Sequence, residues 1–372
     1  MKKILFVVAS AILLAAGCQK TEVLNQAVGD PMTFSTGMAK LTKSATASGD
    51  KNLQSQGFYV WAYAAYTDQL NDVNPGDVHE GIKGIKVTYD GTNCSTGDTD
   101  YYWPGTGLNL DFFAISTTGQ VNAENTASVA FNGQGTDGPR SMILTNYTVN
   151  YQTPGDDLMV AEFVRQNQGM NNKAVSLHFH HALSKVRFKF VTTKDDNNAE
   201  VVTVKSLTVG DDGNAATEDV MVKTKGKLTV NETTELADSD KGRKEIELTW
   251  SEQSEPQIFS VTKEAVLDTE DKWTEAYTSN GEEAYYATWL VLPQDISGLN
   301  VTIAYTIVGE KKTITDSRTF ALTRAGGEGV EAFNNWGTNK VTTYTINISP
   351  NKISFTPSVQ PWDDEEEYTD QN

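Results

Sequence analysis

Cysteine is nearly absent from this sequence, whose 372 residues contain two, Cys18 and Cys94. Cys18 closes an N-terminal segment that resembles a lipoprotein signal, so Cys94 is left without a partner for an intramolecular disulfide. Disulfides stabilise many small exported domains whose cores are too small to fold alone. This chain must instead fold through its hydrophobic core, and 38% of its residues are apolar.

Positive charge is also scarce. The chain carries 30 lysines and arginines against 49 aspartates and glutamates, which gives a formal net charge of −19. Nucleic acids and anionic lipid headgroups bind surfaces rich in lysine and arginine. We therefore expect no nucleic-acid partner and a well-solvated, self-repelling surface.

Recognisable catalytic motifs are missing as well. The sequence has no Gly-x-Ser-x-Gly elbow, no phosphate-binding glycine loop and no His-Glu-x-x-His. His178 and His180 would point the same way on a strand and could share a metal, but no third ligand is indicated nearby. We expect them, with His181, to pack at a sheet edge or domain junction. The acidic run 363–367 lacks the spacing of a calcium loop. The sequence predicts no catalytic residue, no metal, no cofactor and no enzymatic activity.

The N-terminus has the features of an export signal. Two lysines follow the initiator methionine, residues 4–14 are almost entirely apolar, and small residues precede Cys18. The apolar run is far shorter than the roughly 20 residues of a membrane-spanning helix. We predict signal cleavage between Gly17 and Cys18, followed by acylation of Cys18 with chains such as palmitate. One departure is Ala15, where a lipobox usually has leucine.

The hydrophobic pattern behind this signal has the period of two that is typical of β-strands. Residues 58–63 alternate Phe, Val and Ala with Tyr, Trp and Tyr, which predicts a strand with both faces partly covered, whereas 184–191 alternate apolar with basic residues, as in a half-buried strand. Turn signals at 210–214 and 308–311 predict hairpins. Further candidate strands are 31–35, 82–87, 108–115, 141–148, 157–163, 174–179, 201–209, 226–230, 245–250, 257–261, 284–292, 299–308, 312–322, 341–348 and 352–355.

Helical periodicity is nearly absent, so we predict an all-β protein, with β-sandwiches favoured over a barrel. The length suffices for two domains, and the polar stretch 165–172 is the best linker between them. The predicted divisions are a signal peptide at 1–17, a lipidated tether at 18–31, an N-terminal domain at 32–168 and a C-terminal domain with an acidic tail at 169–372.

Three segments resemble a known family. Residues 101–105 (YYWPG) lead into 110–116 (LDFFAIS), residues 157–161 (DLMVA) precede 175–186 (VSLHFHHALSKV), and residues 353–362 read ISFTPSVQPW. With the lipobox, these segments resemble the fimbrillin-like family, whose members are subunits and accessory proteins of lipoprotein-derived (type V) pili in Bacteroides-type bacteria. Residues 181–185 read HALSK. The resemblance also implies that this HALSK motif is a structural signature of the family and binds no ligand.

The resemblance implies two tandem transthyretin-like β-sandwich domains and assembly by strand exchange. In stalk subunits of this family, a protease removes the lipidated N-terminal strand, and the C-terminal strand of the next subunit fills the groove. The cut often follows an arginine, but the first arginine here is Arg140. Lys40, Lys43 and Lys51 are therefore the candidate maturation sites; otherwise the chain keeps its lipid and is not a stalk subunit.

The sequence thus predicts a structural or adhesive fimbrial lipoprotein at the outer membrane and cell surface, or in the fimbrium if processed. Its expected partners are other fimbrial subunits, the outer membrane through its lipid, and a host protein or glycan. A second hypothesis is a glycan-binding surface lipoprotein in which Trp61, Trp103 or Trp273 stacks on sugar rings. A lipid-anchored enzyme is the third alternative.

Overall fold

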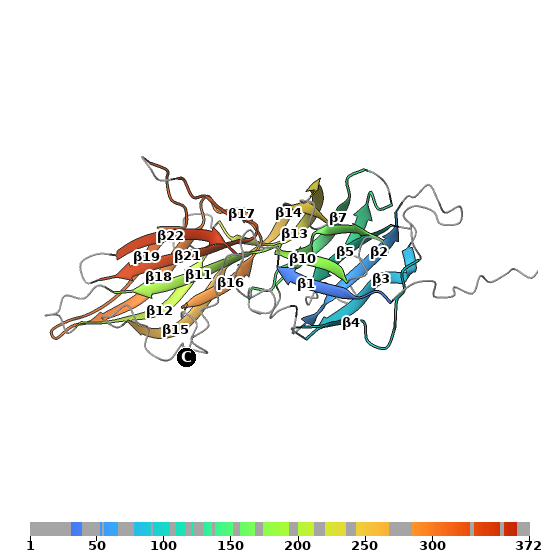
Figure 1. The fold of residues 1–372 in the computed structure, drawn as a ribbon. Helices are drawn as coiled ribbons and strands as arrows, with labels where there is room; N and C mark the ends of the chain where they lie inside the picture. The colour runs from blue at the N-terminus through green and yellow to red at the C-terminus, as the bar shows by residue number, and fades with distance from the viewer. Residues whose placement is uncertain are drawn as a thin grey trace, which may run out of the picture.

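A computed structural model describes residues 31–38, 53, 56–65, 78–90, 92–104, 109–116, 121, 129–135, 138–151, 157–167, 174–192, 200–211, 220–235, 243–267, 285–327, 331–349 and 353–362. These residues lie mainly in strands that form two lobes (Figure 1). Across the described ranges, no helix has the length and apolar character needed to cross a membrane. The predicted all-β fold with sandwich-like sheets is confirmed.

The N-terminal lobe is one sheet of 12 strands, and its apolar side chains belong to two buried clusters. Its main path runs β1-β10-β8-β5-β9-β14-β13-β7-β6, and β2, β3 and β4 branch from β5. The bounds are β1 Phe34–Met38, β2 Phe58–Ala64, β3 Val78–Tyr89, β4 Cys94–Ser95, β5 Leu110–Ser116, β6 Val129–Asn132, β7 Ser141–Thr148, β8 Met159–Ala161, β9 Phe163–Gln166, β10 Val175–His181, β13 Val222–Glu235 and β14 Arg243–Gln257.

Strand β2 shows why this sheet forms. Phe58, Val60 and Ala62 belong to one buried cluster, and Tyr59 and Trp61 belong to a second cluster on the other face. Every residue of the strand is buried. The alternation of two apolar sets along one strand can be satisfied only in a sheet that is covered on both faces. The predicted burial of both faces is therefore confirmed.

The C-terminal lobe is a sandwich of two four-stranded sheets around one large apolar core. One sheet has the order β16-β11-β21-β22 and the other β15-β12-β18-β19, and β17 pairs with β20 at the side. The bounds are β11 Ser184–Val191, β12 Val201–Val209, β15 Phe259–Leu267, β16 Ala287–Val291, β17 Gln294–Asp295, β18 Asn300–Val308, β19 Thr313–Ala321, β20 Asn335–Trp336, β21 Lys340–Ile348 and β22 Ile353–Pro361.

The β13–β14 hairpin belongs to the N-terminal lobe, although it follows a strand of the C-terminal lobe in the sequence. β13 and β14 follow β12 of the C-terminal lobe, yet β13 pairs with β7 and β14 pairs with β9 in the N-terminal lobe. The hairpin predicted at 210–214 was therefore wrong: β12 pairs with β15 and β18, and the chain leaves for the other lobe after β12. The hairpin predicted at 308–311 is confirmed, because β18 pairs with β19 along its whole length.

The polar stretch 165–172 begins within β9, and β9 and β10 both belong to the 12-stranded sheet. β10 pairs with β1 and β8, so residues 175–181, which follow the expected division at 168, belong to the N-terminal lobe. The chain enters the C-terminal sandwich at Ser184, the first residue of β11.

Candidate functional site

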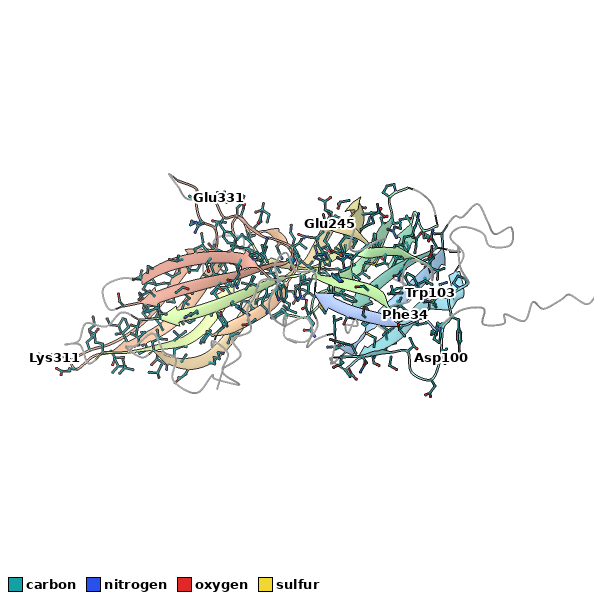
Figure 2. The ribbon with its side chains drawn as sticks, viewed as in Figure 1. Phe34, Asp100, Trp103, Glu245, Lys311 and Glu331 are labelled. Atoms are coloured by element: carbon teal, nitrogen blue, oxygen red, sulfur yellow. The ribbon has the colours of Figure 1, made fainter. Side chains whose placement is uncertain are left out.

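The first described strand, β1, is a sheet edge. β1 runs parallel to β10, from Phe34 opposite Val175 to Met38 opposite Phe179, and β10 is the one described strand that pairs with it. Even so, Phe34 is 6% exposed and contacts the ring of Phe112 edge-on, with centroids 6.3 Å apart. Figure 2 shows Phe34 and Trp103 on the same side of this lobe. A strand with one neighbour therefore closes an apolar core.

Cys94 lies beside this edge strand. It begins β4, and its thiol interacts with the hydroxyl group of Thr36 in β1. Burial raises the pKa of the Cys94 thiol to about 11. A thiol with a raised pKa is a weak nucleophile at neutral pH. Cys94 is therefore a free, half-buried thiol of low reactivity at neutral pH.

The last described strand is an edge as well. β22 pairs antiparallel with β21 along its full length and ends its sheet. Most of its residues are exposed or half-buried. Its inner anchor is Phe355, whose ring stacks on Tyr344 with centroids 5.1 Å apart and on Phe320 of β19 at 5.8 Å. The chain thus offers an edge strand near each end of its described part.

Trp362, directly after β22, is held at the junction of the lobes. Its ring stacks on His181, the last residue of β10, with centroids 3.8 Å apart and planes 4° apart. The ammonium group of Lys185 lies 4.8 Å from the centroid of the Trp362 ring. Nδ1 of His181 lies 2.7 Å from Oδ2 of Asp157. The HALSK motif therefore connects β10 to the C-terminal strand, and we interpret it as a structural joint.

The other two histidines of the cluster also have protein partners. Nε2 of His180 lies 3.1 Å from Oε1 of Glu162. Nε2 of His178 lies 2.6 Å from Nη1 of Arg243, and Nε of Arg243 lies 2.7 Å from Oε2 of Glu162. These contacts fit the expectation that the histidines pack against protein groups, but β10 lies between β1 and β8, so His178 and His180 are not at a sheet edge. Within the described ranges, no group of three His, Cys, Asp or Glu side chains is placed to hold a metal ion.

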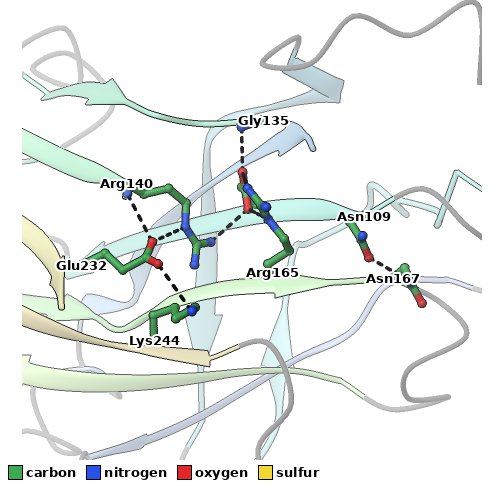
Figure 3. Close-up of polar contacts among 8 residues, drawn as sticks. Asn109, Gly135, Arg140, Arg165, Asn167, Glu232 and Lys244 are labelled. Carbon is green, nitrogen blue, oxygen red and sulfur yellow. Dashed lines mark hydrogen bonds and ion pairs between the residues drawn. The ribbon is translucent and has the colours of Figure 1, made fainter. Parts of the chain in front are cut away.

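A second buried charge cluster was not foreseen (Figure 3). The carboxylate of Asp111 is fully buried in β5, 2.9 Å from Nη1 of Arg140 and 2.7 Å from Nε of Arg165. Nε of Arg140 in turn lies 2.7 Å from Oε2 of Glu232 in β13, and Lys244 of β14 approaches the same side chain. Burying an unpaired charge is costly, so this network ties the β13–β14 hairpin to β5.

The sequence contained one signal for this cluster. Asp111 interrupts the apolar run from Leu110 to Ile115. A carboxylate in a strand with two buried faces requires buried cationic partners. Which arginines supply them follows only from the fold.

Two of the three tryptophans expected to bind sugars are buried. Trp61 and Trp103 are both at most 4% exposed and pack in the N-terminal lobe. Trp273 lies outside the described residues, as do Cys18, the whole segment 1–30, the maturation lysines Lys40, Lys43 and Lys51, and the acidic run 363–367. The structure therefore removes the first two residues from the glycan-binding hypothesis.

The fold and its two edge strands define a class: a two-lobed, all-β protein built from sandwich-like sheets, with sheet edges near both ends of the described chain. The sequence profile described as fimbrillin-like matches residues 42–362. The chain belongs to this family. The prediction that it is not an enzyme is confirmed by that membership.

Solved structures with a related fold include a fimbrial protein from Bacteroides vulgatus. It is 15% identical, with a TM-score of 0.52, and the alignment covers 89% of this chain and 99% of that one. A proposed cell adhesion protein from Bacteroides uniformis is 17% identical, with a TM-score of 0.41 and coverage of 89% and 98%. The tip fimbrial protein Mfa3 from Porphyromonas gingivalis is 10% identical, with a TM-score of 0.34 and coverage of 82% and 94%. No curated protein matches the sequence significantly.

Proposed function

We propose that this protein is a structural or adhesive subunit of cell-surface fimbriae, exported as a lipoprotein through Cys18 and assembled by β-strand exchange. The observation that carries the proposal is the pairing of β1. This strand fills the core with Phe34 but bonds to one strand, β10. Its removal would expose an edge of unpaired backbone groups above an apolar groove, and such an edge binds an added strand.

The chain also contains a suitable donor strand. In β22, Ile353, Phe355 and Val359 are apolar. They are separated by two and by four residues, so their side chains lie on the same face of the strand. This spacing suits a groove that is now filled by Met32 and Phe34 of the N-terminal segment. β22 is an edge strand, so its release breaks a single ladder, that with β21.

The position of the lysines supports proteolytic removal of β1 before strand exchange. Lys40, Lys43 and Lys51 follow β1 in sequence and precede β2. A cut after any of them would separate β1 from the rest of the chain, together with the lipid at Cys18. The product would have an open β10 edge and no membrane anchor.

Limited digestion of the purified chain from residue 19 onward with a lysine-specific protease tests this proposal. Cleavage after Lys40, Lys43 or Lys51, checked by mass, should give polymers detected by native mass spectrometry and electron microscopy. The matched control is K40R/K43R/K51R, which keeps the charge but should resist the cut and stay unpolymerised. If the cleaved chain releases β1 and never polymerises, strand exchange is refuted.

A further inference from the structure

One edge of the C-terminal sandwich is open. β19 ends the sheet β15-β12-β18-β19, and in the described part of the chain only β18 pairs with it. Seven of its nine residues are exposed. Figure 2 shows that its hairpin with β18 reaches the far end of this lobe, where Lys311 is labelled. An open edge of this length is a template for another strand, and native proteins usually block it with proline, charged side chains or a bulge. β19 has no proline and no bulge, and its two charged residues, Asp316 and Arg318, have opposite signs.

The sequence of β19, TITDSRTFA, is self-complementary about Ser317. Two antiparallel copies centred on this residue would place like or complementary side chains opposite each other. The facing pairs are Asp316 and Arg318, Thr315 and Thr319, and Ile314 and Phe320. Opposite-charge, Thr–Thr and aliphatic–aromatic pairs are those that stabilise antiparallel neighbours.

The charges on β19 are already positioned for this pairing. Oδ2 of Asp316 accepts a hydrogen bond from the Tyr305 hydroxyl across the β18–β19 ladder at 3.1 Å and lies 3.2 Å from Nη2 of Arg318. The side chains of Asp316 and Arg318 are nevertheless 39% and 60% exposed. An exposed pair within one strand contributes little stability. Against a second β19, each carboxylate would face the partner's guanidinium as well.

We propose that β19 pairs antiparallel with β19 of a second copy of this chain, about a two-fold axis at Ser317. The two sandwich sheets then form one continuous sheet across the interface, which is isologous. The pairing uses neither β1 nor the β21–β22 ladder, so it is independent of strand exchange. It would join neighbouring fimbriae or surface-anchored copies side by side.

The interface should be weak between free copies and effective between filaments. One nine-residue strand pair buries far less than the roughly 1,200 Å² of a stable interface, and the net charge of −19 repels the two copies. If many copies of β19 are repeated along two neighbouring filaments, the first β19 pair holds the filaments together and each further pair forms within the same assembly. This raises the overall affinity between the filaments. Higher ionic strength should weaken the ion pairs but also screen the repulsion.

Charge reversal tests the register. Analytical ultracentrifugation of the chain from residue 19 onward, in the C94A background, should show a concentration-dependent dimer. D316R and R318D should each weaken it about tenfold or more, because like charges then face each other. An equimolar mixture of the two variants should form a heterodimer, and the double variant D316R/R318D should dimerise like the wild type. Failure of the mixture and the double variant to recover would overturn the proposal.

A crosslink tests the axis directly. Opposite residues in an antiparallel pair have Cα atoms about 4.5 to 5.5 Å apart, within the range of a disulfide. S317C in the C94A background should therefore give a disulfide-linked dimer under mild oxidation. T315C is the matched control, because its symmetry mate would lie about 14 Å away, four residues along the ladder. Equal crosslinking of both variants, or of neither, would contradict the two-fold pairing.

Discussion

Trp362 and His181 stack in parallel at the boundary between the two lobes, 3.8 Å apart and 4° from coplanar. Trp362 is 1% exposed and follows β22, and His181 ends β10. β10 is also the partner of β1. One ring pair thus connects the strand that would receive a donor to the end of the strand that would be donated.

Removal of this ring pair should destabilise the protein and loosen β22. We expect W362A to lower the free energy of unfolding by about 3 to 5 kcal/mol, the range for removing a buried large aromatic side chain. Hydrogen exchange in residues 353–361 should become faster than in β21. V359A, at a strongly exposed position of the same strand, is the matched control and should change neither quantity. Unchanged exchange in W362A would show that Trp362 does not retain β22.

The buried carboxylate of Asp111 should be among the most sensitive positions in the N-terminal lobe. D111A leaves the buried Arg140 and the backbone N–H of Gly135 without this acceptor. We expect a loss of about 3 to 5 kcal/mol in chemical denaturation, as for other broken buried ion pairs. E264A breaks the exposed pair with Lys205 and should cost less than about 1 kcal/mol. Similar losses in both variants would contradict the structural role of the cluster.

Cys94 should report the departure of β1. Burial is the largest cause of its raised thiol pKa and outweighs the contact with Thr36 of β1, which lowers that pKa. Once β1 is removed, the pKa should fall toward its ordinary value, and maleimide labelling at pH 8 should become about tenfold faster or more because the thiolate fraction rises. The uncut K40R/K43R/K51R variant supplies the baseline. A labelling rate that stays the same after confirmed loss of β1 would mean that other residues bury the thiol.

Alkaline pH should destabilise the protein in a defined window. Burial raises the pKa of Cys94 to about 11 and that of Tyr63 to about 12. In the unfolded chain the two groups ionise at their ordinary pKa values of about 8.5 and 10. Between these values and the raised pKa values, each group is protonated in the folded state and ionised in the unfolded state. Their stabilising contribution is therefore complete below the unfolded-state pKa values and is lost as the pH rises through the folded-state pKa values. C94A/Y63F should flatten the fall in unfolding free energy between about pH 8.5 and 12; an unchanged slope would exclude these groups as its cause.

Cys18 should decide where the protein resides. If Cys18 is acylated as we propose, C18S should release the protein from the membrane, because acyl chains would supply the anchoring free energy. Fractionation and mass measurement of the N-terminus in wild-type and C18S cells check this. Membrane retention of C18S would point to another anchor.

The sequence predicted those elements whose patterns are local. The alternation at 58–63 and at 184–191 yielded β2 and β11, with the expected faces buried. β4 and β6 were missed because strands of two to four residues are too short to show a period. The turn residues at 210–214 favour a local hairpin, because strands near in sequence usually pair, but β12 and β13 belong to different sheets. The pairing of β13 with β7 depends on distant contacts that no local pattern encodes.

The same limit applies to the site. The HALSK motif was recognised, but its contact with Trp362 could not be, because the two segments are far apart in the chain. Asp111 was visible as an interruption in an apolar strand, whereas Arg140 and Glu232 reach it only through the folded sheet.

The β13–β14 hairpin determines how the molecule bears load. It begins beside the C-terminal core, where Lys223 N–H donates to Gln294, and continues into the N-terminal sheet along β7. A pull that separates the lobes must therefore slide whole strand ladders past one another, instead of stretching a flexible tether. Gly226 of β13 lies against Trp250 of β14, at a point where a bulge interrupts the register between these two strands. In a fimbrial subunit built in this way, tension between the lobes would pass through continuous strands.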